Sequence, residues 1–208
     1  IRTCASPKRH RLSRPAPYPL GHPGKRNMQR QLKFLSQGII VKKDLLTLLD
    51  FTSEEIESII SLAIDLKKGK SPKLSEKVVA LIFEKPSTRT RVSLEVAALE
   101  LGMHPIYIHA STTQLARGEP IEDFARVMER YVDAICMRVY EHEKLERLAS
   151  SCSIPVINAL SNRFHPLQAL ADLMTIKERF NQIRGLKLCF VGDVANNVAT
   201  SFAIASLK

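Results

Sequence analysis

The sequence lacks the features of several protein classes. Its four cysteines are scattered, with no Cys-x-x-Cys pair and no histidine at ligand spacing, so neither a zinc site nor a disulfide framework is indicated. No apolar run approaches the roughly 20 residues that span a bilayer. The chain of 208 residues is 45% apolar and 25% charged, as is usual for a globular protein. We expect a cytoplasmic protein with reduced thiols, no metal and no membrane partner.

Acidic residues are missing from the first 43 positions. That segment carries eleven of the 31 lysines and arginines, so the other 165 residues hold 20 basic and 21 acidic side chains, a formal charge of −1. The net charge of +10 therefore belongs to the extension, and it does not indicate nucleic acid as a partner. Five prolines by position 23 break any amphipathic helix, although an arginine-rich, acid-free leader is also typical of organellar transit peptides. We predict that residues 1–43 form a disordered basic extension.

From Asp44 onward, apolar runs alternate with amphipathic segments at a spacing typical of α/β proteins. The apolar runs predict strands over residues 78–83, 105–109, 134–139, 154–158 and 186–192. Helices are predicted over residues 53–69, 88–101, 120–131, 141–150 and 166–181, with another starting near Asn196. Thr52, followed by Glu55 three positions on, predicts a capping box at the first helix. This order predicts a parallel sheet with helices on both faces, in which ligands bind beyond the carboxyl ends of the strands.

The segment after the strand predicted over residues 78–83 is rich in hydroxyl and guanidinium groups. At the point where the next helix begins, it contains Ser87, Thr88, Arg89, Thr90 and Arg91. Backbone N–H groups at a helix N-terminus receive phosphate oxygens, hydroxyls add neutral donors, and arginine supplies a bidentate fork. The pattern predicts an anion cradle. A capped helix with a solvated basic turn is the alternative that the residues alone leave open.

Further polar side chains follow the later strands. Arg138 lies near the end of an apolar strand, where its charge is costly unless it faces a ligand or a partner; an edge-strand salt bridge is the alternative. Pro166 suits the first turn of a helix, which puts His165 at the cap and Gln168 one turn along on the same side. Such a pair could polarise a carbonyl and bind an amide, although a histidine at a cap can also be purely structural.

These segments together resemble the aspartate/ornithine carbamoyltransferase family, and most closely its ornithine branch. The resemblance runs from about Lys43 to Lys208 and rests on Ser-Thr-Arg-Thr-Arg at 87–91, Gln-Leu-Ala-Arg-Gly-Glu at 114–119 and His-Pro-Leu-Gln at 165–168. Phe-Glu-Lys-Pro before the first motif and Leu-Ala-Asp after the last favour the ornithine branch. The resemblance implies a carbamoyl phosphate-binding domain over residues 44–184, followed by the start of an ornithine-binding domain over residues 185–208.

The resemblance also implies a reaction, in which the amine of L-ornithine attacks the carbamoyl carbon of carbamoyl phosphate without a cofactor, metal or covalent intermediate. Carried over by motif, the residues that bind carbamoyl phosphate are Ser87, Thr88, Arg89, Thr90, Gln114, Arg138, His165 and Gln168. Among them Thr90, Arg138 and His165 would surround the carbamoyl oxygen and act as the catalytic groups.

The same carry-over implies the remaining contacts. Gln168 would hold the carbamoyl nitrogen, and Gln114 would reach into a neighbouring subunit's site, which implies a homotrimer. Asn197, or alternatively Asn196, would contact ornithine. The Gly-Asp turn before them lacks the GxGxxG pattern of a nucleotide site.

Only one predicted strand and one predicted helix follow residue 184, too few for a second core. We therefore expect these residues to be loosely held or packed abnormally, and the 208-residue chain to have weak transferase activity or none. Aspartate, putrescine or an acylated ornithine is an alternative amine. A non-catalytic carbamoyl phosphate-binding or assembly module is the alternative of another class, and nucleic-acid binding by the basic extension is a third.

Overall fold

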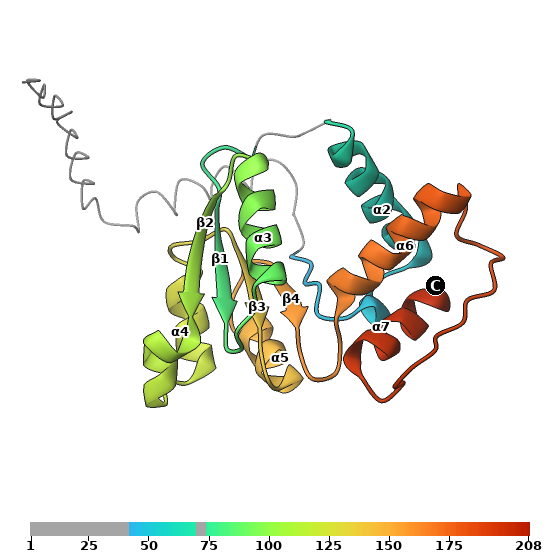
Figure 1. Ribbon diagram of the computed structural model, residues 1–208. Coiled ribbons are helices and arrows are strands. Elements are labelled where there is room, and N and C mark those ends of the chain that lie inside the picture. Colours follow the sequence, from blue (N-terminus) through green and yellow to red (C-terminus); the bar gives the residue numbers. More distant parts are fainter. Residues whose placement is uncertain (1–41, 70–73) are drawn as a thin grey trace, which may run out of the picture.

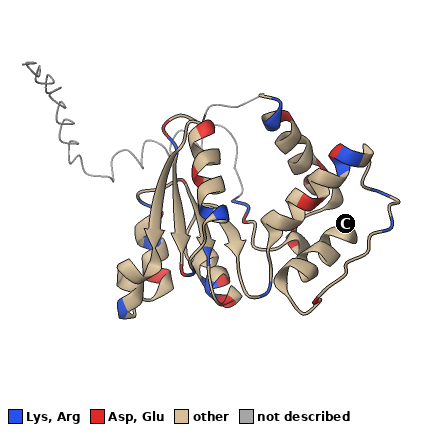
Figure 2. Ribbon diagram, viewed as in Figure 1, with Lys and Arg blue, Asp and Glu red and all other residues tan. Residues whose placement is uncertain are grey.

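The computed structural model describes residues 42–69 and 74–208, which form a four-stranded sheet with helices around it (Figure 1). Disorder was predicted for residues 1–43, and residues 1–41 of this extension lie outside the described residues. Figure 2 shows that the positions of basic and acidic residues are interspersed along the described helices, as the small charge of this part of the sequence leads one to expect. Within these two ranges no helix has the length and apolar character needed to cross a membrane.

All neighbouring strands of the sheet are parallel, in the order β2-β1-β3-β4, so the predicted fold class is confirmed. The strands are β1 (Val78–Phe83), β2 (His104–His109), β3 (Ala134–Arg138) and β4 (Val156–Leu160). β4 begins two residues later than predicted and continues to Leu160, because the carbonyl of Leu160 still accepts a hydrogen bond from the Val139 N–H (3.0 Å).

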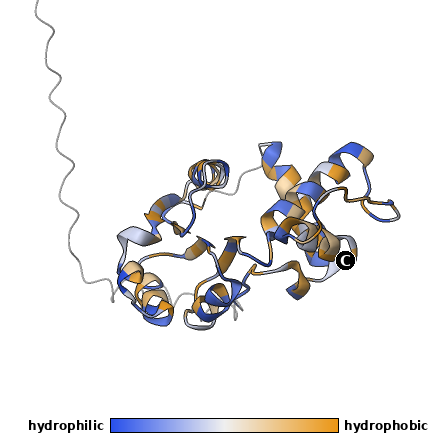
Figure 3. Cartoon of the chain, turned by 60° about the horizontal axis from the view of Figure 1, so that its bottom comes forward, coloured by the Kyte–Doolittle hydropathy of each residue, from blue (hydrophilic) through white to orange (hydrophobic). Residues whose placement is uncertain are grey.

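Helices cover both faces of the sheet, as predicted. Ile82 of β1 packs in one apolar cluster with residues of two helices, whereas its neighbour Leu81 packs on the opposite face against Ala98. Because successive side chains of a strand point to opposite faces, β1 needs an apolar residue at every position. Figure 3 shows these apolar strands between the flanking helices. The helices are α3 (Arg89–Glu100) on one face, and α4 (Ile121–Met128) and α5 (His142–Ser150) on the other.

A second group of helices lies beside β4 (Figure 1). Leu48, Ile60, Leu173 and Ala205 are buried together in the core of this group. The predicted capping box is confirmed: Thr52 Oγ1 accepts from the Glu55 N–H (3.2 Å), and the Glu55 carboxylate accepts from the Thr52 N–H (2.9 Å). The group consists of α2 (Ser53–Lys67), α6 (Pro166–Phe180), α7 (Asn197–Ser206) and the 3-10 turn η1 (Leu48–Asp50).

The strand predicted over residues 186–192 does not form, and this prediction is wrong. The segment has the apolar sequence of a buried strand, but no strand of the described chain runs beside it to supply ladder hydrogen bonds. Its side chains remain in water instead: Val191 is 90% exposed, and Leu188 and Phe190 are also exposed.

Helix α7 is packed, so the first alternative, that residues after about position 185 are loosely held, is wrong for this element, whereas abnormal packing stays a prediction. Ala199, Ser201 and Ala205 are buried, and Ala205 belongs to the core shared with α2 and α6. Asn196 caps the helix by accepting hydrogen bonds from the N–H groups of Val198 and Ala199 (2.9 Å each). The division into two domains at residues 184 and 185 stays a prediction.

Candidate active site

The carboxyl ends of β1, β3 and β4 meet at one edge of the sheet, which is where a parallel sheet holds its ligands. Residues 84–88 connect β1 to α3, Arg138 is the last residue of β3, and residues 161–165 connect β4 to α6. The sheet therefore gathers all three of the segments that the sequence singled out.

Arg138 lies at the centre of this edge. Its Nη1 atom is 3.3 Å from Ser87 Oγ and 3.4 Å from Thr90 Oγ1, so two hydroxyls predicted to bind phosphate flank one guanidinium. The Nε–H group is buried without a hydrogen-bond partner. Partial burial lowers the pKa of the Arg138 guanidinium. A buried donor without a partner is costly, which indicates that a ligand supplies the missing acceptor.

The alternative of an edge-strand salt bridge at Arg138 is wrong. β3 is an inner strand between β1 and β4, and within the described part of the chain no carboxylate pairs with this guanidinium. The pairing with β4 changes register here, because Met137 lies opposite Asn158 whereas Arg138 lies opposite Leu160. Irregularities of this kind redirect side chains next to binding sites.

The N-terminus of α3 is open. Thr88 stands at the N-cap but has helical backbone angles, and its side chain makes no capping hydrogen bond, so the alternative of a conventionally capped helix is wrong. Thr88 and Arg89 are exposed, and Ser87 and Thr90 are half-buried. The first N–H groups of the helix are thus available to an anion, with the positive end of the helix dipole behind them.

His165 precedes Pro166, the first residue of α6, in the predicted arrangement. Its side chain does not cap the helix, and Nδ1 is buried without a hydrogen-bond partner, so the alternative of a structural capping histidine is wrong. Burial lowers the pKa of His165, and the nearby charge of Arg138 lowers it further, whereas Asp172 opposes the shift. The imidazole is therefore neutral near pH 7 and has one N–H to donate.

Two other predicted site residues, Gln168 and Gln114, have no hydrogen bond to Arg138 in the described part of the chain. Gln168, in the first turn of α6, is exposed and donates to Asp172 Oδ1 (2.9 Å). Gln114 begins the 3-10 turn η3 (Gln114–Arg117), which follows edge strand β2 and the turn η2 (Ala110–Thr112), and its side chain is exposed. Within the described residues Gln114 makes no hydrogen bond to Arg138, Ser87 or Thr90.

Asn197 approaches the site from α7. Its Nδ2 atom donates to the Ser161 carbonyl (2.6 Å), at the start of the segment that leads to His165. Asn196, the alternative, accepts two capping hydrogen bonds instead. A hollow of about 340 Å³ separates residues 162–164 from the N-terminal end of α7.

The residues that hold this edge together were not predicted from the sequence. Glu84 accepts a hydrogen bond from the Tyr140 N–H (2.9 Å), which ties the ends of β1 and β3. His142 is 1% exposed and lies 2.9 Å (Nδ1) from Ser161 Oγ. Ser201 Oγ accepts from the His165 N–H (2.8 Å). Each of these contacts joins residues that are far apart in the sequence. Because no local sequence pattern predicts contacts of this kind, nothing in the sequence indicated them.

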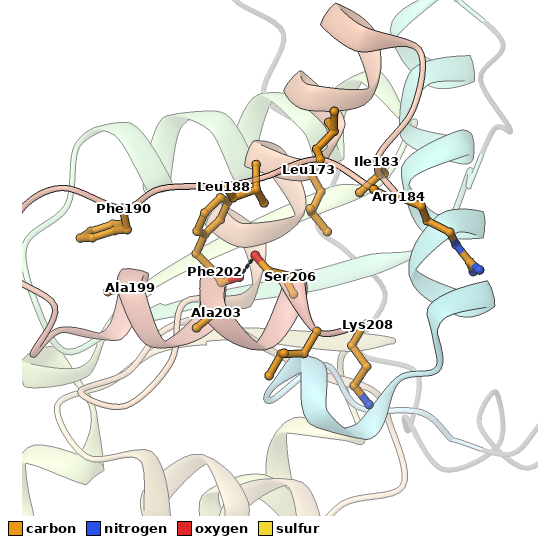
Figure 4. A pocket seen from close by; sticks show the side chains of 14 residues that line it. Leu173, Ile183, Arg184, Leu188, Phe190, Ala199, Phe202, Ala203, Ser206 and Lys208 are labelled. Carbon is orange, nitrogen blue, oxygen red and sulfur yellow. Dashed lines mark hydrogen bonds between the residues drawn. The ribbon is translucent and has the colours of Figure 1, made fainter.

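A second cavity lies away from this edge, between α6, α7 and residues 183–190 (Figure 4). It measures about 640 Å³, most of the residues that line it are apolar in type, and none of the predicted site residues is among them. Labelled side chains in Figure 4 that line it include Leu173, Ile183, Leu188, Phe190 and Phe202. The cavity is therefore separate from the candidate site.

The fold and the site define a class of protein. A guanidinium between two hydroxyls, an open helix N-terminus and a neutral imidazole are suited to a small phosphorylated ligand that also carries a polar carbonyl. The molecule is thus a parallel α/β protein with a candidate anion site at the carboxyl edge of its sheet.

Residues 43–178 match the model of the aspartate/ornithine carbamoyltransferase family's carbamoyl phosphate-binding domain, and the chain belongs to this family. It is 52% identical over 170 residues to an ornithine carbamoyltransferase of Ignicoccus hospitalis, covering 79% of this chain and 55% of that protein.

Solved structures give the same result. An ornithine carbamoyltransferase from Pyrococcus furiosus superposes with a TM-score of 0.75 at 52% identity, covering 80% of this chain and 55% of that one. One from Thermus thermophilus superposes with a TM-score of 0.74 at 44% identity, covering 78% and 58%. The chain spans about half the length of the relatives that it matches.

Proposed function

We propose that the protein transfers the carbamoyl group of carbamoyl phosphate to the amine of L-ornithine, giving L-citrulline and phosphate. The observation that carries the proposal is Arg138, held between the hydroxyls of Ser87 and Thr90, with an unpartnered His165 Nδ1 at the same edge. Membership of the family supports the carbamoyl donor, and the names of the relatives support ornithine as the acceptor.

The phosphate of the donor binds at the start of α3. The hydroxyls of Ser87, Thr88 and Thr90 and the uncapped N–H groups supply neutral donors, and the exposed Arg89 supplies a bidentate fork. A phosphate held there puts the carbamoyl end of the ligand toward Arg138.

The carbamoyl oxygen then lies among Arg138, Thr90 and His165. When the amine nitrogen forms a bond to the carbamoyl carbon, this oxygen takes up negative charge, and the three groups stabilise it. The bond between that carbon and the bridging oxygen breaks, phosphate leaves with the bonding electrons, and the amine loses its surplus proton to phosphate or solvent. The lowered pKa of His165 keeps its imidazole neutral, with one N–H as donor.

Two glutamines complete the donor site. Gln168, whose Nε2 donates to Asp172, offers its Oε1 as the acceptor for the carbamoyl N–H group. Gln114 is exposed beyond the edge strand, so we propose that it serves the site of a second copy and that the whole protein is a homotrimer. We further propose a cytoplasmic location and a role in arginine metabolism.

The amine binds next to α7. Asn197 lies beside the segment that carries His165, and the hollow of about 340 Å³ opens at the same place. An amine that enters there would attack one face of the planar carbamoyl group.

Transfer of labelled carbamoyl groups tests the proposal. The protein is incubated with ¹⁴C-carbamoyl phosphate and, in parallel, with ornithine, aspartate, putrescine or N-acetylornithine, and labelled products are separated. Citrulline is expected as the main product, at a low rate for the 208-residue chain. A faster reaction with another amine contradicts ornithine as the acceptor. Tight donor binding by the whole protein without any product supports a non-catalytic module instead.

A further inference from the structure

Ser201, in the second turn of α7, touches the backbone of His165. Its Oγ accepts a hydrogen bond from the His165 N–H at 2.8 Å and donates one to the Asn197 carbonyl at 2.8 Å. The side chain is buried, with 2% of the residue exposed. The hydroxyl therefore both accepts and donates a hydrogen bond, which fixes its orientation. Its bond to the His165 N–H joins residues 36 positions apart.

Few other hydrogen bonds fix the backbone on the N-terminal side of His165. Phe164 is tied back to Ser161, since its N–H donates to Ser161 Oγ (3.1 Å) and its carbonyl accepts from the Ser161 N–H (3.0 Å). The chain then turns through His165 with φ −135° and ψ 71°, and Pro166 has no N–H. Between the Ser161 turn and the helical hydrogen bonds of α6, the His165 N–H is therefore the donor that fixes the turn.

The first turns of α7 hold this segment at both ends. Asn197 Nδ2 binds the carbonyl of Ser161, and Ser201 Oγ binds the N–H of His165. On the other side, the His142 ring packs edge-on against Phe164, with ring centroids 4.8 Å apart. The segment is consequently clamped between α5 and α7, and α7 holds the residue that carries the imidazole.

We propose that Ser201 is a positioning residue for His165: its hydroxyl fixes the backbone that aims the imidazole at the carbamoyl end of the ligand. The proposal rests on the proposed function, because that function assigns the carbamoyl end to His165. Ser201 touches no residue of the segment that binds phosphate, so its role is confined to one half of the ligand.

The test compares two ligands. Inorganic phosphate reports on the phosphate half of the site, and carbamoyl phosphate reports on both halves. In Ser201→Ala, the lost hydroxyl leaves the His165 N–H buried without an acceptor, and the turn can relax. Calorimetry should give a phosphate affinity within twofold of that of the unmodified chain and a carbamoyl phosphate affinity roughly tenfold weaker. Ser201→Thr keeps the hydroxyl and should bind carbamoyl phosphate more tightly than Ser201→Ala.

Ser206→Ala is the matched control. Ser206 lies on the same helix and donates to the carbonyl four residues earlier, Phe202 (2.7 Å), just as Ser201 donates to Asn197, but it is exposed. Its removal should leave both affinities unchanged. Thermal unfolding of each variant shows whether the helix is retained.

One measurement needs no substitution. In the unmodified chain the His165 amide proton should exchange slowly with deuterium, because Ser201 accepts its hydrogen bond. Exchange as fast as that of an exposed amide overturns the proposal, and so does a Ser201→Ala variant that loses both affinities equally or neither. An unmodified chain that binds carbamoyl phosphate no better than phosphate contradicts the proposed function instead. In that case the exchange rate still tests the hydrogen bond from the His165 N–H to Ser201.

Discussion

Arg138 Nη1 lies 3.3 Å from Ser87 Oγ, although 51 positions separate the two residues. The register of the sheet produces this contact, because Arg138 of β3 pairs with Phe83, the last residue of β1. The loop that follows β1 therefore lies next to the Arg138 guanidinium. The site is a property of two neighbouring parallel strands, and substitutions on either strand end should act on the same ligand.

Arg89 and Arg91 offer a matched pair of substitutions. Arg89 is exposed at the start of α3, whereas Arg91 stacks on the Tyr107 ring (3.6 Å) and pairs with Glu95 (3.5 Å). Arg89→Ala should lower the rate of carbamoyl transfer by about 10²–10³-fold, since a preorganised donor is lost. Arg91→Ala should change the rate little. Binding of carbamoyl phosphate, measured by calorimetry, should fall in the first variant alone; unchanged binding in Arg89→Ala would refute its role at the phosphate.

Two buried histidines predict how stability depends on pH. Burial lowers the pKa values of His142 and His165 below the ordinary value of about 6.5, so the unfolded chain binds more protons than the folded one below that pH. The free energy of unfolding should therefore fall as the pH drops from 7 to 5, and urea denaturation at both values measures the slope.

A substitution tests whether His165 contributes to this decline in the free energy of unfolding. His165→Gln removes one of the two groups and should show a shallower decline between pH 7 and 5. His104→Gln, at an exposed position of β2, is the control and should keep the slope of the unmodified chain. An equally steep decline in His165→Gln would show that this histidine is not held neutral by folding.

The cysteines should differ strongly in reactivity. Burial raises the pKa of Cys136 to about 12 and also raises that of Cys152, whereas Cys189 is exposed. In a Cys4→Ser background, a thiol reagent at pH 8 should modify Cys189 within the first phase and Cys136 only as the protein unfolds. Cys189→Ser should remove the fast phase. Rapid modification of Cys136 in the folded protein would contradict its burial in the sheet.

Thr52 should contribute measurably to stability as the cap of α2. Thr52→Ala removes the side-chain acceptor for the Glu55 N–H and leaves only the bond from the residue 52 N–H to the Glu55 carboxylate, at a cost of about 1 kcal/mol in the free energy of unfolding. Ser58→Ala, in the middle of the same helix, removes only a bond to the Glu54 carbonyl and should change stability by less than about 0.5 kcal/mol. Equal effects in the two variants would argue against a special role for the cap.

The elements that could be predicted are those with a local cause. The bounds of β1 were predicted correctly, because a strand covered on both faces must be apolar at every position from Val78 to Phe83. The box of Thr52 and Glu55 and the start of α6 at Pro166 were also predicted, since each depends on residues within one helical turn.

The features that could not be predicted depend on distant parts of the chain. Residues 186–192 have the sequence of a strand but no neighbouring strand, and a ladder needs two. Ser201 holds His165 across 36 positions, a relation that only packing of α7 on α6 creates. The roles of Arg138 and His165 followed from the resemblance of their motifs, whereas their unpartnered nitrogens required the structure.

The proposed function depends above all on Arg138 as the residue that receives carbamoyl phosphate, and calorimetric titration of Arg138→Met with this ligand is the test of that role. Arg147→Met is the control, because Arg147 is an exposed residue paired with Glu122. Loss of a charged donor to the ligand predicts affinity about 10–100-fold weaker than that of the unmodified chain. Arg147→Met should bind as the unmodified chain does. Equal binding of carbamoyl phosphate by all three proteins would contradict the account.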